Sequence, residues 1–168
     1  MKNIIIFMLL LLSVVGFVGC ENKNNNDYLR IHIRANSNNE EDQNVKFFIK
    51  DIVVEYMTPL LVDAKNKNDV MLIIEENKRE LIHVVDMALQ SQGFDYGCSI
   101  SINNEFFPTR NYDGLTLDAD YYDALIVNLG SGDGNNWWCV MYPNLCFNNP
   151  NDVVYKSKIK EIIDKIKG

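Results

Sequence analysis

The segment from Trp137 to Tyr142, WWCVMY, constrains the fold more than any other part of the chain. It holds both tryptophans of the protein, side by side, in a run of residues that favours a β-strand. Adjacent side chains on a strand point to opposite faces of the sheet. The two tryptophans therefore cannot enter one core, and at least one must cover another element of the chain or a partner.

The N-terminal residues have the form of a signal peptide. An apolar run from Ile4 to Val18 follows Lys2 and is too short to span a bilayer comfortably. Gly19-Cys20 at its end resembles the lipobox of bacterial lipoproteins, so we expect residues 1–19 to be removed and Cys20 to be lipidated. A plain secretory signal cleaved near Gly19, or an uncleaved anchor, is the alternative.

Residues 29–168 have the length of one compact domain, and the polar, Asn-rich residues 20–28 predict a tether before it. Without residues 1–19 the chain has 15 basic and 23 acidic side chains, a net charge of −8. Nucleic acid requires a basic surface, so this charge argues against a nucleic-acid partner.

The alternation of Leu29 to Arg34 predicts a half-buried strand. Its aliphatic side chains should face the core, and its three basic-type side chains, Arg30, His32 and Arg34, should face the other way. We expect two helical regions to follow. The first begins at a capping box, Ser37 with Glu40, and weakens at Thr58-Pro59. The second runs from about Asp69 to Gln92, is bent or divided at Asn77 and ends at Gly93.

Three strands and a last helix complete the predicted order. The strands are expected at residues 96–102, 124–129 and 137–142, and the helix at residues 152–167. The order β-α-α-β-β-β with a C-terminal helix predicts the α/β (α+β) class, in which helices pack on a small mixed sheet. The glycine-rich residues 130–134 lie between two strands and predict a hairpin loop rather than a phosphate loop.

The chain shows little sign of catalytic chemistry. Neither a Cys-x-x-Cys nor a His-x-x-x-His pair is present, so we expect no metal site. His32 and His83 are best interpreted as solvated or core histidines, and the carboxylates of residues 118–123 as a solvated loop.

Four segments together resemble the stage II sporulation protein R family. The first is Arg30-Ile-His-Ile-Arg-Ala-Asn-Ser37 with Glu41-Asp42-Gln43 and Lys50-Asp51. The others are Phe107-Pro-Thr-Arg-Asn-Tyr112, Tyr122-Asp-Ala-Leu125, and Gly130-x-Gly-x-Gly-x-Asn-Trp-Trp-Cys-Val140 followed by Tyr142-Pro143 and Leu145-Cys146-Phe147. Arg34 replaces a usual aliphatic residue, residues 118–121 replace a Pro-Ala-Gly-Glu-like turn, and Asn144 replaces a proline.

The resemblance implies a secreted intercellular signal of sporulation, which is a ligand and not an enzyme and needs no cofactor. Such a protein is made in the forespore and exported into the intermembrane space. There it activates a membrane-embedded aspartic protease that processes the pro-form of the mother-cell sigma factor, sigma-E. The alternative is an envelope lipoprotein that acts as a binding module, or a small envelope hydrolase with His32, Asn36 and Arg110 around a pocket.

A ligand of this kind needs an aromatic and charged surface. We expect the partner-binding residues to be Arg30, His32, Arg34, Asn36, Arg110, Trp137 and Trp138. The alternative is that acidic neighbours such as Asp42, Asp51 or Asp123 neutralise the basic side chains and that both tryptophans only pack.

Cys139 and Cys146 are expected to form a disulfide, because the chain acts outside the cytoplasm and Tyr142-Pro143-Asn144 offers a turn between them. Two buried free thiols are the alternative. Cys98 should then be unpaired, since lipidation of Cys20 leaves an odd number of cysteines.

Overall fold

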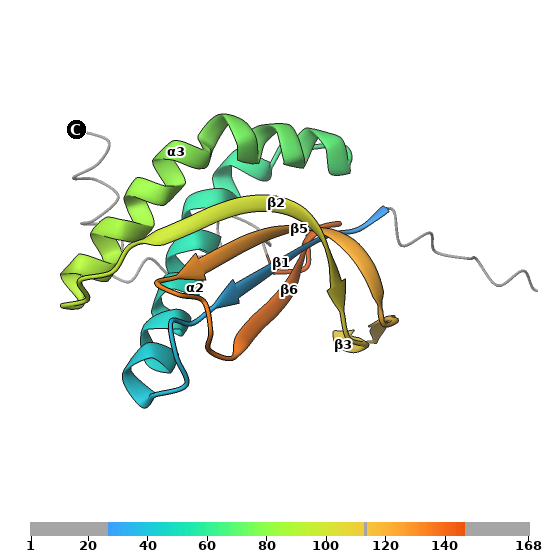
Figure 1. The fold of residues 1–168 in the computed structure, drawn as a ribbon. Helices are drawn as coiled ribbons and strands as arrows, with labels where there is room; N and C mark the ends of the chain where they lie inside the picture. The colour runs from blue at the N-terminus through green and yellow to red at the C-terminus, as the bar shows by residue number, and fades with distance from the viewer. Residues whose placement is uncertain (1–26, 113, 147–168) are drawn as a thin grey trace, which may run out of the picture.

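The computed structural model describes residues 27–112 and 114–146 (Figure 1). The elements in chain order are β1 (Leu29–Arg34), α2 (Glu40–Leu61), α3 (Lys67–Ser91), β2 (Cys98–Phe107), β3 (Arg110–Tyr112), β4 (Leu115–Leu117), β5 (Asp120–Leu129) and β6 (Asn136–Tyr142). Two helices on a small mixed sheet confirm the predicted α/β (α+β) class. The expected signal peptide, Cys20 and the helix at residues 152–167 lie outside the described residues.

The main sheet has the strand order β2-β5-β1-β6. β1 runs parallel to β5 and antiparallel to β6, and β2 runs antiparallel to β5. β1 therefore lies between the two strands that residues 130–134 connect. The expected hairpin at these residues is wrong, because β5 and β6 do not pair and the loop crosses the end of β1 instead.

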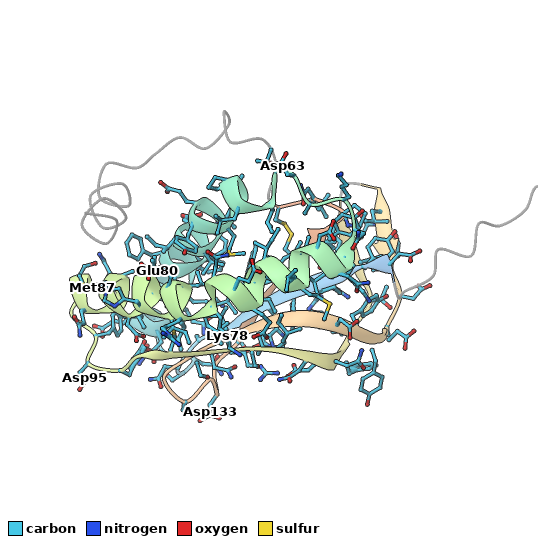
Figure 2. All side chains as sticks on the ribbon, turned by 90° about the horizontal axis from the view of Figure 1, so that it is seen from above. Asp63, Lys78, Glu80, Met87, Asp95 and Asp133 are labelled. Atoms are coloured by element: carbon cyan, nitrogen blue, oxygen red, sulfur yellow. A yellow bond between two sulfur atoms is a disulfide. The ribbon has the colours of Figure 1, made fainter. Side chains whose placement is uncertain are left out.

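Both helices cover one face of the sheet, and α3 runs roughly along the direction of the strands when seen from above (Figure 2). α2 begins two residues later than a Ser37 cap would place it. Asn39 is the cap, and its side-chain oxygen accepts a hydrogen bond from the Asp42 amide at 2.7 Å. The hydroxyl of Ser37 instead accepts a bond from the Asn39 amide at 3.2 Å.

The second helical region is one helix rather than two. The Asn77 side chain donates to the Ile73 carbonyl at 2.8 Å, within the turn that precedes it, so it does not cap a new helix. Asn66 caps the N-terminus of α3 by accepting from the Asp69 amide at 3.0 Å. Gly93 follows the helix with φ +87°, a conformation that favours glycine, as expected of a residue that ends a helix.

The sheet has a hydrophobic core on each face. The helix-side core contains the inward aliphatic side chains of β1 and the apolar faces of both helices, including Leu29, Ile31, Ile33, Ile49, Ile52, Leu81, Val85, Leu125 and Val127. The second core, on the other face, consists of Tyr28, Phe107, Leu117, Tyr122, Ala124, Ile126 and Val140. Tyr28, the last residue of the expected tether, is thus part of the packed domain.

A small hairpin covers part of the second core. β3 and β4 pair with each other as a two-stranded sheet, which the sequence did not predict. The end of β2 bends away from α3, and β3 lies on the side of the main sheet opposite the helices (Figure 1). β2 and β5 each have 10 residues, longer than the predicted strands, because they pair along their whole length.

Candidate functional site

The three basic-type side chains of β1 lie on the face away from the helices, as their alternation predicts, but they differ greatly in exposure. Arg30 is 0% exposed and His32 is 2% exposed, whereas Arg34 is half-buried. Phe107 packs against both Arg30 and His32, and Tyr112 of the hairpin also contacts Arg30. Of this row, only Arg34 presents part of its side chain to solvent.

Arg30 is enclosed by aromatic rings. Its guanidinium carbon lies 4.1 Å from the centre of the Phe107 ring and 4.8 Å from that of Tyr122, and Nη2 donates to the Tyr112 hydroxyl at 2.7 Å. Nε and Nη1 have no hydrogen-bond partner. Burial lowers the pKa of Arg30, as expected for a cation removed from water.

His32 is neutral at pH 7. Burial, together with the nearby positive charges of Arg34 and Arg30, lowers its pKa to about 4. Its Nε2 lies 3.3 Å from Oε2 of Glu105, but neither ring nitrogen makes a hydrogen bond. Because the imidazole is uncharged at this pH, the contact with Glu105 is not an ion pair there.

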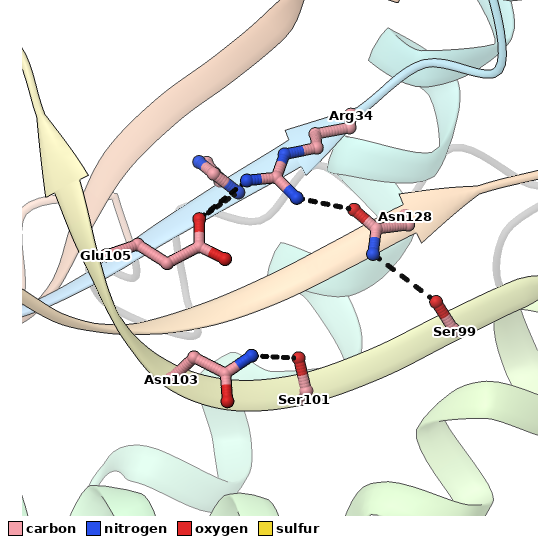
Figure 3. Close-up of polar contacts among 7 residues, drawn as sticks. Arg34, Ser99, Ser101, Asn103, Glu105 and Asn128 are labelled. Atoms are coloured by element: carbon pink, nitrogen blue, oxygen red, sulfur yellow. Dashed lines mark hydrogen bonds and ion pairs between the residues drawn. The ribbon is translucent and has the colours of Figure 1, made fainter. Parts of the chain in front are cut away.

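Arg34 is the ion-pair partner of Glu105. Nη2 donates to Oε2 of Glu105 at 2.6 Å, and Nη1 donates to the side-chain oxygen of Asn128 at 3.3 Å. The amide of Asn128 in turn donates to the Ser99 hydroxyl at 3.4 Å, so a polar row crosses β1, β5 and β2 (Figure 3). The charge of Arg34 is therefore balanced within the chain, as the alternative of internal neutralisation expects, but the acidic neighbour is Glu105 and not Asp42, Asp51 or Asp123.

Asn36 joins the loop after β1 to the glycine-rich loop. Its side-chain oxygen accepts from the Ser131 amide at 3.0 Å, and its amide donates to Asp42 at 3.1 Å. Gly130 has φ +55°, and a Cβ there would overlap the Asn36 side chain. Both ends of the Asn36 side chain are thus engaged inside the protein, and the loop glycine is required for this close approach.

Asp42 is the buried acceptor of this loop network. Burial raises the pKa of its carboxyl group, but hydrogen bonds, among them those from Tyr96 and Asn36, outweigh that effect and hold the pKa below its usual value. The Tyr96 hydroxyl donates to Asp42 at 2.5 Å. These contacts give Asn36 and Asp42, both in the first segment of the resemblance, a structural role.

The two tryptophans lie on opposite faces of β6, as their adjacency predicts. Trp137 packs against the helix-side core, with Nζ of Lys50 5.9 Å from its ring centre. Trp138 packs against the second core, with the guanidinium carbon of Arg110 4.1 Å from its ring centre. Both tryptophans remain half-buried, so each packs and also presents part of its ring to solvent.

The structure therefore brings most of the predicted partner-binding residues to one face. Arg30, His32, Arg34, Arg110 and Trp138 share it, whereas Trp137 is on the other face and Asn36 is in a loop. The residues that enclose this cluster, Glu105, Phe107, Tyr112 and Tyr122, were not predicted to belong to the site. The available signal was the presence of Phe107, Tyr112 and Tyr122 in the segments that carry the family resemblance.

Cys139 and Cys146 are joined as a disulfide, with 6.4 Å between their Cα atoms. The bridge folds the end of the described chain back toward β6, and the Cys146 amide donates to the Val140 carbonyl at 3.4 Å. Cys98 is the free cysteine of the described part, and burial raises the pKa of its thiol. The described residues contain no cluster of three or more metal-ligating side chains, and none of their helices is long and apolar enough to cross a membrane.

These features define a single-domain α+β protein with a basic and aromatic cluster on one sheet face and an asparagine–glycine loop at the sheet's end. The chain belongs to the stage II sporulation protein R family, because the model of that family, Stage II sporulation protein R (spore_II_R), matches residues 25–152. The family resemblance noted in the sequence is thereby confirmed.

A curated relative has the same name as the family. Stage II sporulation protein R of Bacillus subtilis (strain 168) is 32% identical over 119 residues, which are 71% of this chain and 53% of the relative. The chain thus spans about half the length of that relative. No solved structure matches the chain.

Proposed function

We propose that this chain is an exported signal of sporulation that activates a membrane-embedded aspartic protease, which then processes the pro-form of the mother-cell sigma factor. In this proposal the chain acts as a ligand rather than as an enzyme. It is made in the forespore and acts in the intermembrane space, free or held to a membrane by a lipid on Cys20.

Membership of the stage II sporulation protein R family carries this proposal. The sequence adds two supports, which are the signal-like residues 1–19 and a net charge of −7 for the whole chain that disfavours nucleic acid as a partner.

The surface around Trp138 supports a ligand role. Trp138 and Arg110 stack on each other at the rim of the second core, both half-buried. Tryptophan and arginine are the residue types that most often dominate the energetics of protein interfaces. Arg34 is half-buried on the same face. Arg30 has no exposed surface, so in this proposal it supports the site from beneath and does not touch the partner.

An envelope hydrolase receives no such support. It would bring the polar groups of His32, Asn36 and Arg110 together in a hollow. Asn36 is bonded within its loop, and His32 is buried against the Phe107 ring. Two hollows, of about 530 and 400 Å³, are lined by other residues.

Co-expression tests the proposal. The chain, the protease and its substrate should be produced together in a bacterium that does not sporulate, and cleavage of the substrate should be scored on immunoblots. Cleavage is expected only when all three proteins are present. A chain that is exported and folded but leaves the substrate intact would contradict the proposal.

Single substitutions then locate the surface. Arg110→Ala, Trp138→Ala and Arg34→Ala should abolish or strongly reduce cleavage while the exported amount stays as in the wild type. Lys78→Ala is the matched control, because Lys78 lies on α3, on the opposite side of the sheet (Figure 2). Trp137→Ala should also reduce cleavage, but its contact with the helix-side core requires a melting measurement beside the immunoblot. Full activity in all of these variants would remove this surface from the proposal.

A further inference from the structure

β6 is an edge strand of the main sheet. Within the described residues it pairs with β1 on one side and with no strand on the other. Its C-terminal half is protected, since the disulfide folds residues 143–146 back and the Cys146 amide bonds to the Val140 carbonyl. The N-terminal half, Asn136 to Trp138, has no such cover from the described part of the chain.

The backbone groups of this half point outward in a known pattern. In an antiparallel pair, successive residues direct their N–H and C=O groups alternately toward and away from the partner strand. Because the Val140 carbonyl bonds outside the ladder with β1, the amide and carbonyl groups of Trp138 and Asn136 point the same way, away from β1. An unpaired edge of this kind is a template for another extended chain.

The side chains beside this edge are aromatic and basic. Natural proteins usually protect an edge strand with proline, charge or a bulge. Here Trp137 and Trp138 extend from the two faces of the strand, and each has a cation against its ring, Lys50 on one side and Arg110 on the other. Lys50 is ion-paired with Asp51, but Arg110 has no carboxylate within 4.0 Å among the described residues.

The charge at this edge indicates what could bind there. The whole chain has a net charge of −7, so a basic edge is a local exception that attracts an acidic segment. A second copy of the chain pairing at the same edge around a two-fold axis would bring Arg110 of both copies toward each other, which disfavours self-pairing.

We propose that the free half of the β6 edge, Asn136 to Trp138, binds an extended acidic segment of a partner protein by strand addition. The segment pairs with the outward backbone groups, its alternate side chains contact Trp137 and Trp138, and its carboxylates meet Arg110. This rests on the proposed function only in that the chain acts by binding another protein.

A displayed library of random 12-residue peptides tests the inference without use of the protease. The mature full-length chain serves as bait, and enriched peptides are sequenced and synthesised. Acidic peptides with alternating apolar residues are expected. Their binding should fall by about tenfold or more in the Arg110→Glu variant, because this change reverses the charge of the side chain that lies over the Trp138 ring. Lys78→Glu, the same charge change on α3, should bind them as the wild type does.

A proline at the edge tests the backbone contact. Asn136→Pro removes an outward N–H group and is compatible with an edge strand, so the domain should keep its melting temperature and lose the peptides. Hydrogen exchange should show the Trp138 amide unprotected in the free chain and protected with peptide bound. If the Asn136→Pro variant does not fold, the Arg110→Glu variant still tests whether the charge of Arg110 contributes to peptide binding.

Three results would overturn the inference. They are enrichment of no peptides or of basic ones, unchanged binding to both variants, and a Trp138 amide that is already protected in the free chain, which would mean that the chain itself covers the edge. Peptide binding without substrate cleavage in the co-expression assay would instead retain the strand-addition site and contradict the proposed function.

Discussion

Lowering the pH from 7.5 to 5 should destabilise the domain through His32. The imidazole is 2% exposed in the folded chain and has a pKa of about 4, against 6.5 for an ordinary histidine. The unfolded chain therefore binds a proton in this range that the folded chain does not. The stability that His32 contributes is complete above pH 6.5 and is lost as the pH falls toward 4.

The size of the effect follows from these two values. With pKa values of 6.5 and about 4, the free energy of unfolding should fall by about 2 kcal/mol between pH 7.5 and pH 5, and by about 3 kcal/mol once the pH is below 4. Other groups also change with pH. Burial, with the charge of Asp51, raises the pKa of Glu55, so protonation of Glu55 favours the folded state over part of the same range. Only a comparison with a His32 variant isolates the histidine.

Urea unfolding followed by tryptophan fluorescence should be measured between pH 7.5 and pH 5 for the wild type and for His32→Gln. Both tryptophans are in β6, so their emission reports on the sheet. The difference in unfolding free energy between the two proteins should change by about 2 kcal/mol over this range. The exposed His83 supplies the matched control, His83→Gln. Parallel curves for the wild type and His32→Gln would refute the reasoning, as would an NMR titration of His32 with a midpoint near 6.5.

Three further outcomes follow from the loops and the disulfide. Asn36→Ala should lower the free energy of unfolding by about 2 kcal/mol in urea titrations, because it leaves the partners of both ends of the amide unpaired. Gly130→Ala should destabilise the domain more than Gly114→Ala, since both glycines have positive φ but only Gly130 approaches Asn36; equal losses by thermal melting would contradict this. Cys139→Ser should lower the free energy of unfolding by about 2 kcal/mol, because the disulfide closes a loop of seven residues. Mass spectrometry of the exported chain without reductant should find Cys139 and Cys146 resistant to alkylation.

Local periodicity predicted the elements that form by local rules. The alternation of β1, the apolar faces of α2 and α3, and the opposite directions of Trp137 and Trp138 all depend on residues close in sequence, and the structure has them as expected. The strand order could not be read in the same way. β1 pairs with β5, which begins about ninety residues later, and with β6, which begins more than one hundred residues later, and nothing in the local pattern specifies which strand lies on which side.

The burial of Arg30 was missed for the same reason. An arginine on the polar side of an alternating strand predicts an exposed side chain. Here Phe107, Tyr112 and Tyr122, all more than seventy residues away, supply rings and a hydroxyl that make burial tolerable. The hairpin that carries Tyr112 consists of two three-residue strands, which are too short to give a periodic signal.

The central position of β1 has a consequence for the order in which the domain can form. β1 is the first strand of the domain, yet it must pair on both sides with strands from the end of the described chain. Arg34 of β1, for example, bonds to Asn128, 94 residues later. While the chain emerges from a ribosome or a translocation channel, β1 comes out first and has both edges unpaired until β5 and β6 follow. Pairing of strands that are so far apart in the sequence makes folding slow. A chain truncated before β5 can form helices but cannot close its sheet, so folding must wait until nearly the whole domain has been delivered.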